Sequence, residues 1–358
     1  MNPAFWQGKR VFLTGHTGFK GSWLSLWLQT LGAELTGFAL PPNAPLNLFE
    51  CASVASGMQS VVGDVLDLNA MQHAMKAAQP DIVIHMAAQA LVRYGYHNPV
   101  ETYATNVMGT VHVLESVRHT PSVRAVVNVT SDKCYEQRTF DRGFTEDDPM
   151  GGFDPYSNSK GCAELVSAAY RDSYFGPETY GQHGVALATA RAGNVIGGGD
   201  WSTDRLIPDI LAAFVQGREV AIRNPNAVRP WQHVLEALSG YLVLAERLYG
   251  DGPVVAGAWN FGPQAQDNRT VAWVVEQMAT RWGQDARWRI DDNQHPHEAE
   301  HLRLDISKAS QQLDWQPAMN LTTALQLTMD WARQKHAGKA MRQVTEAQIQ
   351  AYQAARVG

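Results

Sequence analysis

The stretch Arg10-Val11-Phe12-Leu13-Thr14, followed directly by Gly15-His16-Thr17-Gly18-Phe19-Lys20-Gly21, decides the fold of this chain. The first five residues are mostly apolar and predict a short strand, and Trp23-Leu24-Ser25-Leu26-Trp27-Leu28 has the spacing of a helix. Three glycines between a strand and a helix let the backbone turn tightly and approach a phosphate, while the helix N-terminus offers free N–H groups and a partial positive charge. The stretch therefore predicts a dinucleotide-binding turn, although a glycine triplet alone can also be a structural turn.

Short apolar runs alternate with helical segments over the first half of the chain. We expect strands at Glu34–Leu40, Ser60–Val62, Asp81–His85, Arg124–Thr130 and Val185–Arg191, and helices near 67–78, 98–119 and 155–175. Strands that alternate with helices form a parallel sheet covered on both faces. The fold class is therefore α/β, with a Rossmann-like doubly wound parallel sheet.

The pattern becomes less regular after residue 191. Loops rich in Gly, Pro and Trp are expected around 197–206 and 223–233, a turn at Asn260-Phe261-Gly262-Pro263, and helices at 204–216, 234–249, 270–282 and 321–336. We expect an NAD-binding domain over 1–190, a smaller nucleotide-sugar-binding lobe over 191–340 with some chain crossing between them, and a polar tail over 341–358 that forms a surface helix.

Composition limits the class of protein. The chain has 358 residues, 45% hydrophobic and 18% charged, with a net charge of -6 and a pI near 6.0, which disfavours nucleic acid or an anionic membrane as partner. The N-terminus lacks a secretory signal, and no apolar run approaches the roughly 20 residues of a membrane span, so we expect a soluble, cytoplasmic protein. The cysteines, Cys51, Cys134 and Cys162, are expected to be reduced thiols, and no metal site is predicted.

The segment Tyr156-Ser157-Asn158-Ser159-Lys160 places a phenol and an ammonium on one face of a helix. A nearby cation favours the phenolate, so Tyr156 can take a hydroxyl proton while hydride leaves the same carbon. The alternative is an ordinary helix face, because this spacing also occurs by chance.

The Gly-x-x-Gly-x-x-Gly spacing and the Tyr-x-x-x-Lys pair resemble the extended short-chain dehydrogenases/reductases, and further segments resemble their nucleotide-sugar 4,6-dehydratases, in particular the CDP-glucose dehydratases. The resemblance spans roughly residues 8 to 335. The segments that carry it are His85–Arg93, Tyr103–Thr110, Thr130–Lys133, Arg191–Trp201 and Arg229–Val234.

The resemblance implies a catalytic set of Ser131, Asp132, Lys133, Tyr156 and Lys160. Ser131 would bond the hydroxyl that is oxidised at C4, and Asp132 would protonate the departing 6-hydroxyl. The dTDP-glucose dehydratases carry Asp-Glu where this chain has Asp-Lys, and Lys133 would be either the base at C5 or a charge that stabilises the enolate. The implied product is CDP-4-dehydro-6-deoxy-D-glucose plus water, in deoxysugar biosynthesis for lipopolysaccharide O-antigen and other surface polysaccharides.

The resemblance also implies NAD as cofactor. The expected contacts are Gly15, His16, Thr17, Gly18, Phe19, Lys20, Gly21, Asp64, Val65, Ala87, Ala88, Gln89, Asn106, Tyr156 and Lys160. Asp64 can equally be the cap of the helix at 67–78. The second strand ends Phe38-Ala39-Leu40-Pro41-Pro42, which lacks both the acidic residue that usually binds the NAD ribose and an arginine for a 2′-phosphate.

The expected substrate contacts are Arg93, Asn194, Asp200, Trp201, Arg205 and Arg229. The Asn194 amide can bond the sugar diphosphate, and Arg205 and Arg229, expected in loops, suit bidentate binding of a diphosphate. Either arginine alone can instead be part of a surface ion pair.

Three alternatives accompany this interpretation. The first is a dTDP- or GDP-sugar dehydratase, the second is a 4-epimerase, which Asp132 disfavours, and the third is a non-catalytic dinucleotide sensor, which would not need Tyr156, Lys160 and Asp132 together. Apolar residues over 98–119 and 155–175 predict a homodimer or homotetramer, since these segments pair between subunits in relatives.

Overall fold

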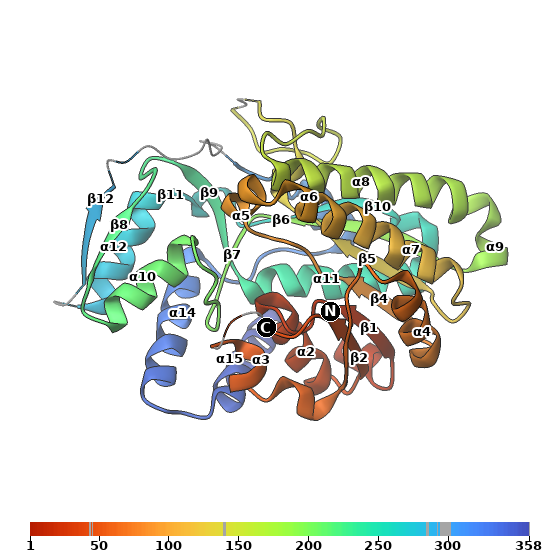
Figure 1. The fold of residues 1–358 in the computed structure, drawn as a ribbon, viewed down its shortest axis with the longest axis horizontal. Coiled ribbons are helices and arrows are strands. Elements are labelled where there is room, and N and C mark those ends of the chain that lie inside the picture. The colour runs from red at the N-terminus through yellow and green to blue at the C-terminus, as the bar shows by residue number, and fades with distance from the viewer. Residues whose placement is uncertain are drawn as a thin grey trace.

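A seven-stranded parallel sheet occupies the larger part of the computed structural model, which describes residues 1–42, 44, 46–138, 141–283, 286–291, 293 and 302–357 (Figure 1). The strand order is β10-β6-β5-β4-β1-β2-β3. The order reverses between β1 and β4, and in such sheets ligands bind beside this point, at the carboxyl ends of the strands. The predicted Rossmann-like doubly wound sheet is confirmed. Its strands are β1 (Arg10–Thr14), β2 (Glu34–Ala39), β3 (Gln59–Val62), β4 (Ile82–His85), β5 (Ala125–Val129), β6 (Ala186–Ala192) and β10 (Gly257–Phe261).

Helices cover both faces of this sheet because its strands are apolar on both sides. In β1, Val11 and Leu13 belong to the core under α2 and α11, whereas Phe12 belongs to the core under α4 and α7. The first face carries α2 (Phe19–Thr30), α11 (Val234–Asp251) and α15 (Met341–Val357), and the second carries α4 (Leu68–Ala78), α7 (Gly109–Arg118) and α8 (Pro155–Tyr174). The shorter helices are α1 (Pro3–Trp6), α3 (Leu48–Cys51), α5 (Val92–His97), α6 (Pro99–Tyr103) and α9 (Tyr180–His183).

The helix expected over 98–119 is interrupted. The π-helical turn η2 (Ala104–Met108) separates α6 from α7. A π turn adds a residue to the helical repeat and often marks a functional site. Here it carries Asn106, which is buried at 2% exposure and faces the loop after β4.

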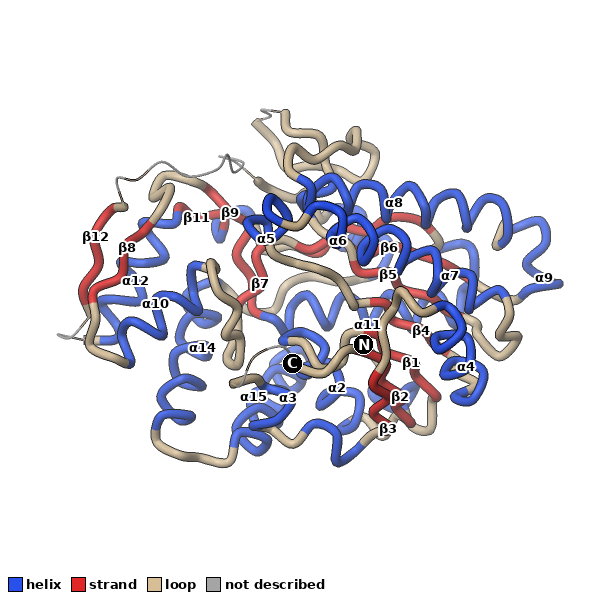
Figure 2. The backbone as a smooth tube through the Cα atoms, in the orientation of Figure 1, coloured by secondary structure: helices blue, strands red, loops and turns tan. Residues whose placement is uncertain are grey.

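The smaller part has its own core and two small sheets, and Figure 2 shows β8 and β12 at its edge, away from the seven-stranded sheet. The loop expected over 223–233 is confirmed for 223–227 and wrong for the rest, because Val228–His233 forms β9 and is fully buried between β7 and β11. The strand was not predicted because it contains Pro230, and proline is rare inside a sheet. The strands are β7 (Asn194–Ile196), β8 (Glu219–Ile222), β9 (Val228–His233), β11 (Asn268–Thr270) and β12 (Arg287–Ile290), and the helices are α10 (Leu206–Val215), α12 (Val271–Trp282), α13 (Ser307–Leu313) and α14 (Leu321–His336).

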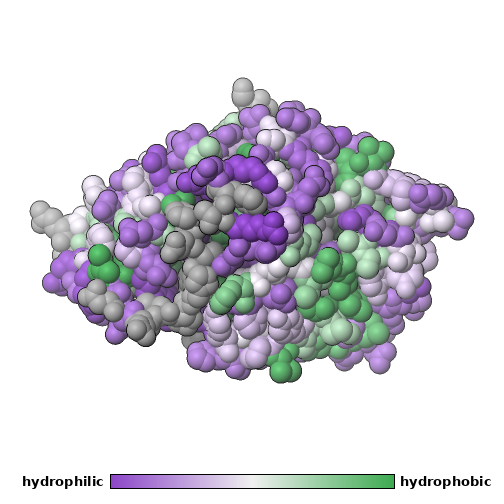
Figure 3. All heavy atoms as spheres, turned by 90° about the horizontal axis from the view of Figure 1, so that it is seen from above, coloured by the Kyte–Doolittle hydropathy of each residue, from purple (hydrophilic) through white to green (hydrophobic). Residues whose placement is uncertain are grey.

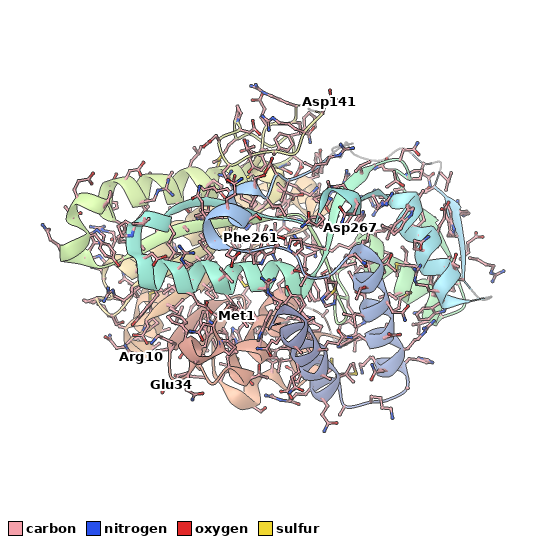
Figure 4. All side chains as sticks on the ribbon, turned by 180° about the vertical axis from the view of Figure 1, so that it is seen from behind. Met1, Arg10, Glu34, Asp141, Phe261 and Asp267 are labelled. Atoms are coloured by element: carbon pink, nitrogen blue, oxygen red, sulfur yellow. The ribbon has the colours of Figure 1, made fainter. Side chains whose placement is uncertain are left out.

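The turn expected at Asn260-Phe261 is also wrong. Both residues lie in β10, which pairs with β6 and returns the chain to the large sheet. Phe261, labelled in Figure 4 beside α11, packs edge-on against Tyr241 and Trp315. The boundaries expected for the two folding units stay a prediction.

The C-terminal segment is a helix, as expected, but one of its faces is buried. Met341, Ile349 and Tyr352 of α15 join the core under α2. The segment reads as polar because its other face is solvated, whereas the buried positions recur at helical spacing. None of the helices within the described ranges is both long and apolar enough to cross a bilayer.

Candidate active site

The glycine turn lies between β1 and α2, and its glycines have two different roles. Gly15 has φ +78°, and a Cβ there would lie 2.7 Å from the Ala87 nitrogen, while a Cβ on Gly21 would lie 2.0 Å from the Gly15 oxygen. These two positions need glycine for the chain's own packing. Gly18 differs, since its Cβ would meet only the Gly15 oxygen, at 3.4 Å. No side chain caps α2 at Gly18, so the free space and the helix N-terminus fit a phosphate group.

Two side chains of the turn point into the protein. His16 Nε2 lies 2.8 Å from the Ser60 hydroxyl, and burial lowers the pKa of His16 to about 4, so the ring is neutral. The Thr17 hydroxyl donates to the Leu40 carbonyl at 2.9 Å. Any contact of these two residues with a dinucleotide is therefore expected from the backbone.

Lys20 reaches the catalytic residues. Its ammonium donates to the Tyr241 hydroxyl at 3.4 Å. Burial, followed by the charge of Lys160, lowers the pKa of Lys20 to about 7.

The loop after β4 is held by the π turn. Asn106 accepts a bond from the Gln89 N–H and donates to the Gln89 carbonyl, both at 2.9 Å, and also donates to Ser159 of α8 at 2.8 Å. Asn106 thus positions Ala87, Ala88 and Gln89 against α8.

The loop after β3 resolves an alternative left open by the sequence. Asp67, not Asp64, caps α4 by accepting a bond from the Ala70 N–H at 2.9 Å. Asp64 accepts from the Leu66 N–H, and Val65 is buried. The adenine contact expected from Asp64 stays a prediction.

Four predicted catalytic residues converge where β5 ends against α8. Ser131 and Asp132 follow β5, and Tyr156 and Lys160 lie one helical turn apart in α8. Ser131 interacts with the Tyr156 phenol and donates to Asp132 Oδ1 at 3.1 Å. The Lys160 ammonium donates to the Val129 carbonyl at 3.3 Å.

Burial changes the acidity of this cluster. It raises the pKa of Tyr156 to about 12, partly offset by Ser131, and lowers the pKa of Lys160 to about 8, against the charge of Glu164. Burial also raises the pKa of Asp132, against the charge of Lys133. Asp132 is 2% exposed, and among the described residues its Oδ2 has no hydrogen-bond partner. A buried carboxyl with a raised pKa and one unpaired oxygen is suited to donate a proton.

Lys133 lies beside this cluster on the short turn η3 (Asp132–Cys134). Its N–H donates to the Ser131 hydroxyl at 3.2 Å, and its side chain lines a pocket together with Asp154 and Ser157. Cys134 is fully buried, and burial raises the pKa of its thiol, which agrees with an inert structural role.

The expected substrate residues differ in how deeply they are buried in the protein. Arg93 of α5 pairs with Asp204 at 3.0 Å, and Arg205 pairs with Asp200 at 3.3 Å and bonds the Ala90 carbonyl. The bonds from Arg93 to Asp204 and from Arg205 to Ala90 join the two parts of the molecule, whereas the Arg205–Asp200 pair lies within the smaller part.

Three other expected substrate residues lie in or near the small sheet β11-β9-β7. Arg229 was expected in a loop, but it lies on β9. It is 4% exposed because that strand pairs on both sides. Asn194 begins β7, and Trp201 packs edge-on against Trp331 of α14.

Two residues of the site were not predicted. Tyr241 of α11 is fully buried, and burial, with smaller effects of Tyr156 and Asp132, raises its pKa. Glu164 of α8 forms a buried ion pair with Arg191 at 2.8 Å. Tyr241 has the pattern of a core residue in its helix, whereas Glu164 follows Lys160 by four residues, which was an available signal.

Comparison with known proteins identifies the family of the chain. The sequence model of a family described as GDP-mannose 4,6 dehydratase matches residues 12–328. The chain belongs to this dehydratase family. Among curated dehydratases, CDP-glucose 4,6-dehydratase of Salmonella typhimurium is 54% identical to the chain over 351 residues, which cover 98% of each protein. It is 23% identical to dTDP-glucose 4,6-dehydratase of Haemophilus influenzae, over 90% of this chain and 97% of the relative.

Solved structures share the fold of this dehydratase. dTDP-glucose 4,6-dehydratase of Bacillus anthracis in complex with NAD has a TM-score of 0.76 and 24% identity, covering 92% of this chain and 98% of the other. MoeE5 in complex with UDP-glucose and NAD has a TM-score of 0.78 and 22% identity, covering 92% and 100%. At this level of identity the likeness shows the fold alone, and the chemistry must be argued from the site.

Proposed function

We propose that the chain is a lyase that converts CDP-D-glucose to CDP-4-dehydro-6-deoxy-D-glucose and water. The observation that carries the reaction type is Asp132, a buried carboxyl with an unpaired oxygen beside Ser131 and Tyr156. A 4-epimerase has no leaving hydroxyl and does not need this acid. The identity of 54% over nearly the full length of a CDP-glucose dehydratase supports CDP as the nucleotide.

NAD is the cofactor that fits the glycine turn. The space beside Gly18 and the uncapped N-terminus of α2 would receive its pyrophosphate. Ala87–Gln89 follow β4 beside Gly15, and Asp64 and Val65 follow β3, so these residues would line the bound dinucleotide, while Tyr156 and Lys160 would meet its nicotinamide end. When bound, NAD accepts the hydride from C4 of the sugar and returns it to C6.

The side chains of the cluster then divide the proton transfers. Tyr156, next to Ser131, acts as the phenolate that the Lys160 ammonium favours, takes the proton of the 4-hydroxyl and becomes a neutral phenol. The 4-ketone makes the C5 proton acidic, and Lys133 either removes it or stabilises the enolate by charge. Asp132 donates a proton to the 6-hydroxyl, which leaves as water, and a proton returns to C5 when C6 receives the hydride.

Arg93, Asn194, Asp200, Trp201, Arg205 and Arg229 are the substrate residues of this proposal. Arg229 is buried close enough to Asp132 to oppose the rise of its pKa, so it would bind the inner part of the nucleotide sugar. Arg93 and Arg205 lie at the junction of the two parts, where a diphosphate can replace their carboxylate partners. We place the reaction in cytoplasmic deoxysugar biosynthesis for surface polysaccharide, with no membrane or nucleic-acid partner.

The purified protein should dehydrate CDP-glucose at least about tenfold faster than dTDP-, GDP- or UDP-glucose, a ratio worth about 1.4 kcal/mol of transition-state binding. The measurement is mass spectrometry of each nucleotide sugar for the loss of one water without added NAD. Equal rates with CDP- and dTDP-glucose would reject the CDP assignment, and no water loss from any of them would reject the reaction.

The second face of the large sheet is proposed to form a homodimer or a dimer of dimers. Val100 of α6, Met108 of η2 and Leu165 of α8 are 82%, 46% and 60% exposed. Figure 3 looks down on the side that carries α8 and shows apolar side chains gathered on this face. Exposed apolar groups on adjacent helices favour burial against a second copy.

Light scattering at micromolar concentration should give about twice the chain mass of 39.4 kDa, or a higher even multiple. Leu165→Glu should lower this mass, because a carboxylate is costly to bury in an apolar contact. Val254→Glu is the matched control, since Val254 is 85% exposed in the short 3-10 turn Gly252–Val255, which follows α11, a helix of the first face. A monomeric parent protein would refute the assembly.

A further inference from the structure

A buried carboxylate, Glu164, connects the catalytic helix to two strand ends. Glu164 is 3% exposed, and both of its oxygens are bonded. One oxygen accepts a short bond from the Thr130 hydroxyl at the end of β5. The other accepts from the Thr189 hydroxyl at 2.7 Å and from the Arg191 guanidinium at 2.8 Å, both on β6.

These contacts adjoin the catalytic residues of α8 and of the segment after β5. Glu164 follows Lys160 by four residues and Tyr156 by eight, so all three share one face of α8. Lys160 bonds the carbonyl of Val129 and Glu164 bonds the side chain of Thr130, so α8 holds two consecutive residues of the main chain. Ser131 and Asp132 are the next two residues.

The buried ion pair of Glu164 and Arg191 is expected to add little to the stability of the fold. Arg191 is 1% exposed, and removing two charges from water often cancels the gain from their attraction. Well-packed apolar side chains can replace such a pair without loss of stability. Arg191 is itself fixed by the Tyr135 hydroxyl at 2.8 Å and the Glu146 carbonyl at 3.1 Å, so the carboxylate has one defined position.

We propose that Glu164 is a positioning residue of the reaction, which fixes α8 against the end of β5 and keeps the Lys160 ammonium charged. Lys160 is 6% exposed, and burial alone would favour its neutral form. The carboxylate supplies the largest opposing effect, so it maintains the cation that Tyr156 requires. This inference rests on the proposed function, in which Tyr156 acts as the base at the 4-hydroxyl.

Several titratable groups surround Lys160 and its partners. They are Tyr156 and Glu164 from α8, Asp132 and Cys134 from η3, His85 from β4, Lys20 from α2 and Arg191 from β6. Burial lowers the pKa of His85 to about 3, so this ring adds no charge near neutral pH. Among the carboxylates of this set, Glu164 is the one that lies a single helical turn from Lys160.

Glu164→Gln should lower kcat about tenfold to a hundredfold, with KM changed less than about threefold, because misplaced catalytic groups slow the chemical step more than binding. The alkaline limb of the kcat profile should move to lower pH by about one unit, since Lys160 loses its proton more easily without the carboxylate. Glu164→Asp should lower kcat but keep the alkaline limb, because it retains the charge and changes only the reach.

The control for folding is the double variant Glu164→Gln with Arg191→Met, which removes both buried charges. It should melt close to the parent protein, yet keep the low kcat and the shifted alkaline limb. Glu115→Gln removes an arginine-paired carboxylate from neighbouring α7 and should change neither quantity. A double variant with parental kcat and parental limb would overturn the positioning role.

Titration of isotope-labelled Lys160 by NMR, assigned with Lys160→Met, separates this inference from the proposed function because it needs no turnover. The Lys160 midpoint should fall in Glu164→Gln and stay in Glu115→Gln. An unshifted midpoint refutes the charge role even in an active enzyme. A shifted midpoint in a protein that dehydrates no nucleotide sugar supports the charge role and refutes the proposed function alone.

Discussion

Tyr156→Phe should abolish oxidation of the substrate and reduce turnover by at least about a hundredfold, as is typical when a general base is lost. The reason is that Tyr156 is assigned as the base for the 4-hydroxyl, whereas Asp132, which also bonds Ser131, is assigned as the acid for the 6-hydroxyl; phenylalanine fills the same buried space. Single-turnover absorbance in the NADH band should show no reduced cofactor. The thermal midpoint should change little, since the lost hydroxyl gives up its interaction with Ser131 while the ring stays buried.

Tyr170→Phe is the matched control for this prediction. Tyr170 lies in the same helix α8, burial also raises its pKa to about 12, and its hydroxyl bonds Glu115 at 3.3 Å, away from the cluster. This variant should retain parental turnover. Reduced cofactor appearing at the parental rate in Tyr156→Phe would remove Tyr156 from its assigned role.

The larger sheet was predictable because its strands carry a local signal. Short apolar runs separated by amphipathic helices placed β1 through β6 within one or two residues of their observed positions. The strands β9 and β10 escaped prediction for physical reasons. Pro230 and its polar neighbours are buried by pairing on both sides, and Phe261 precedes a Gly-Pro pair that resembles a turn. Pairing between distant segments decided both cases, and single-sequence patterns do not report it.

The site was predictable where its residues share a motif. Tyr156 and Lys160 follow from helical spacing, and Ser131 and Asp132 from the resemblance of the segment after the fifth strand to the dehydratases. Contacts between distant segments bring Tyr241 and the Glu164–Arg191 pair to the site. For example, 221 residues separate Lys20 from Tyr241, which it bonds. Tyr241 has the pattern of a core residue and Arg191 lies on a buried strand, so their partners become visible only when the fold brings the segments together.

Asp132→Asn should separate the two halves of the reaction. The amide keeps the shape of the carboxyl and its contact with Ser131, so oxidation at C4 should proceed. It has no acidic proton for the 6-hydroxyl, so water loss should slow by about a hundredfold to ten-thousandfold. In a single turnover, reduced cofactor and a 4-keto sugar that still holds its 6-hydroxyl should accumulate, which absorbance and mass spectrometry detect separately.

Glu246→Gln supplies the same chemical change outside the site. Burial raises the pKa of Glu246 as it does that of Asp132, but Glu246 bonds the Trp6 indole at 2.7 Å and the Asn2 N–H near the N-terminus. This variant should dehydrate at the parental rate without accumulation of reduced cofactor. If Asp132→Asn also dehydrates at the parental rate, another group protonates the leaving hydroxyl, and the buried oxygen of Asp132 has a different purpose. If Asp132→Asn instead fails at oxidation, the carboxyl acts in the first step together with Tyr156.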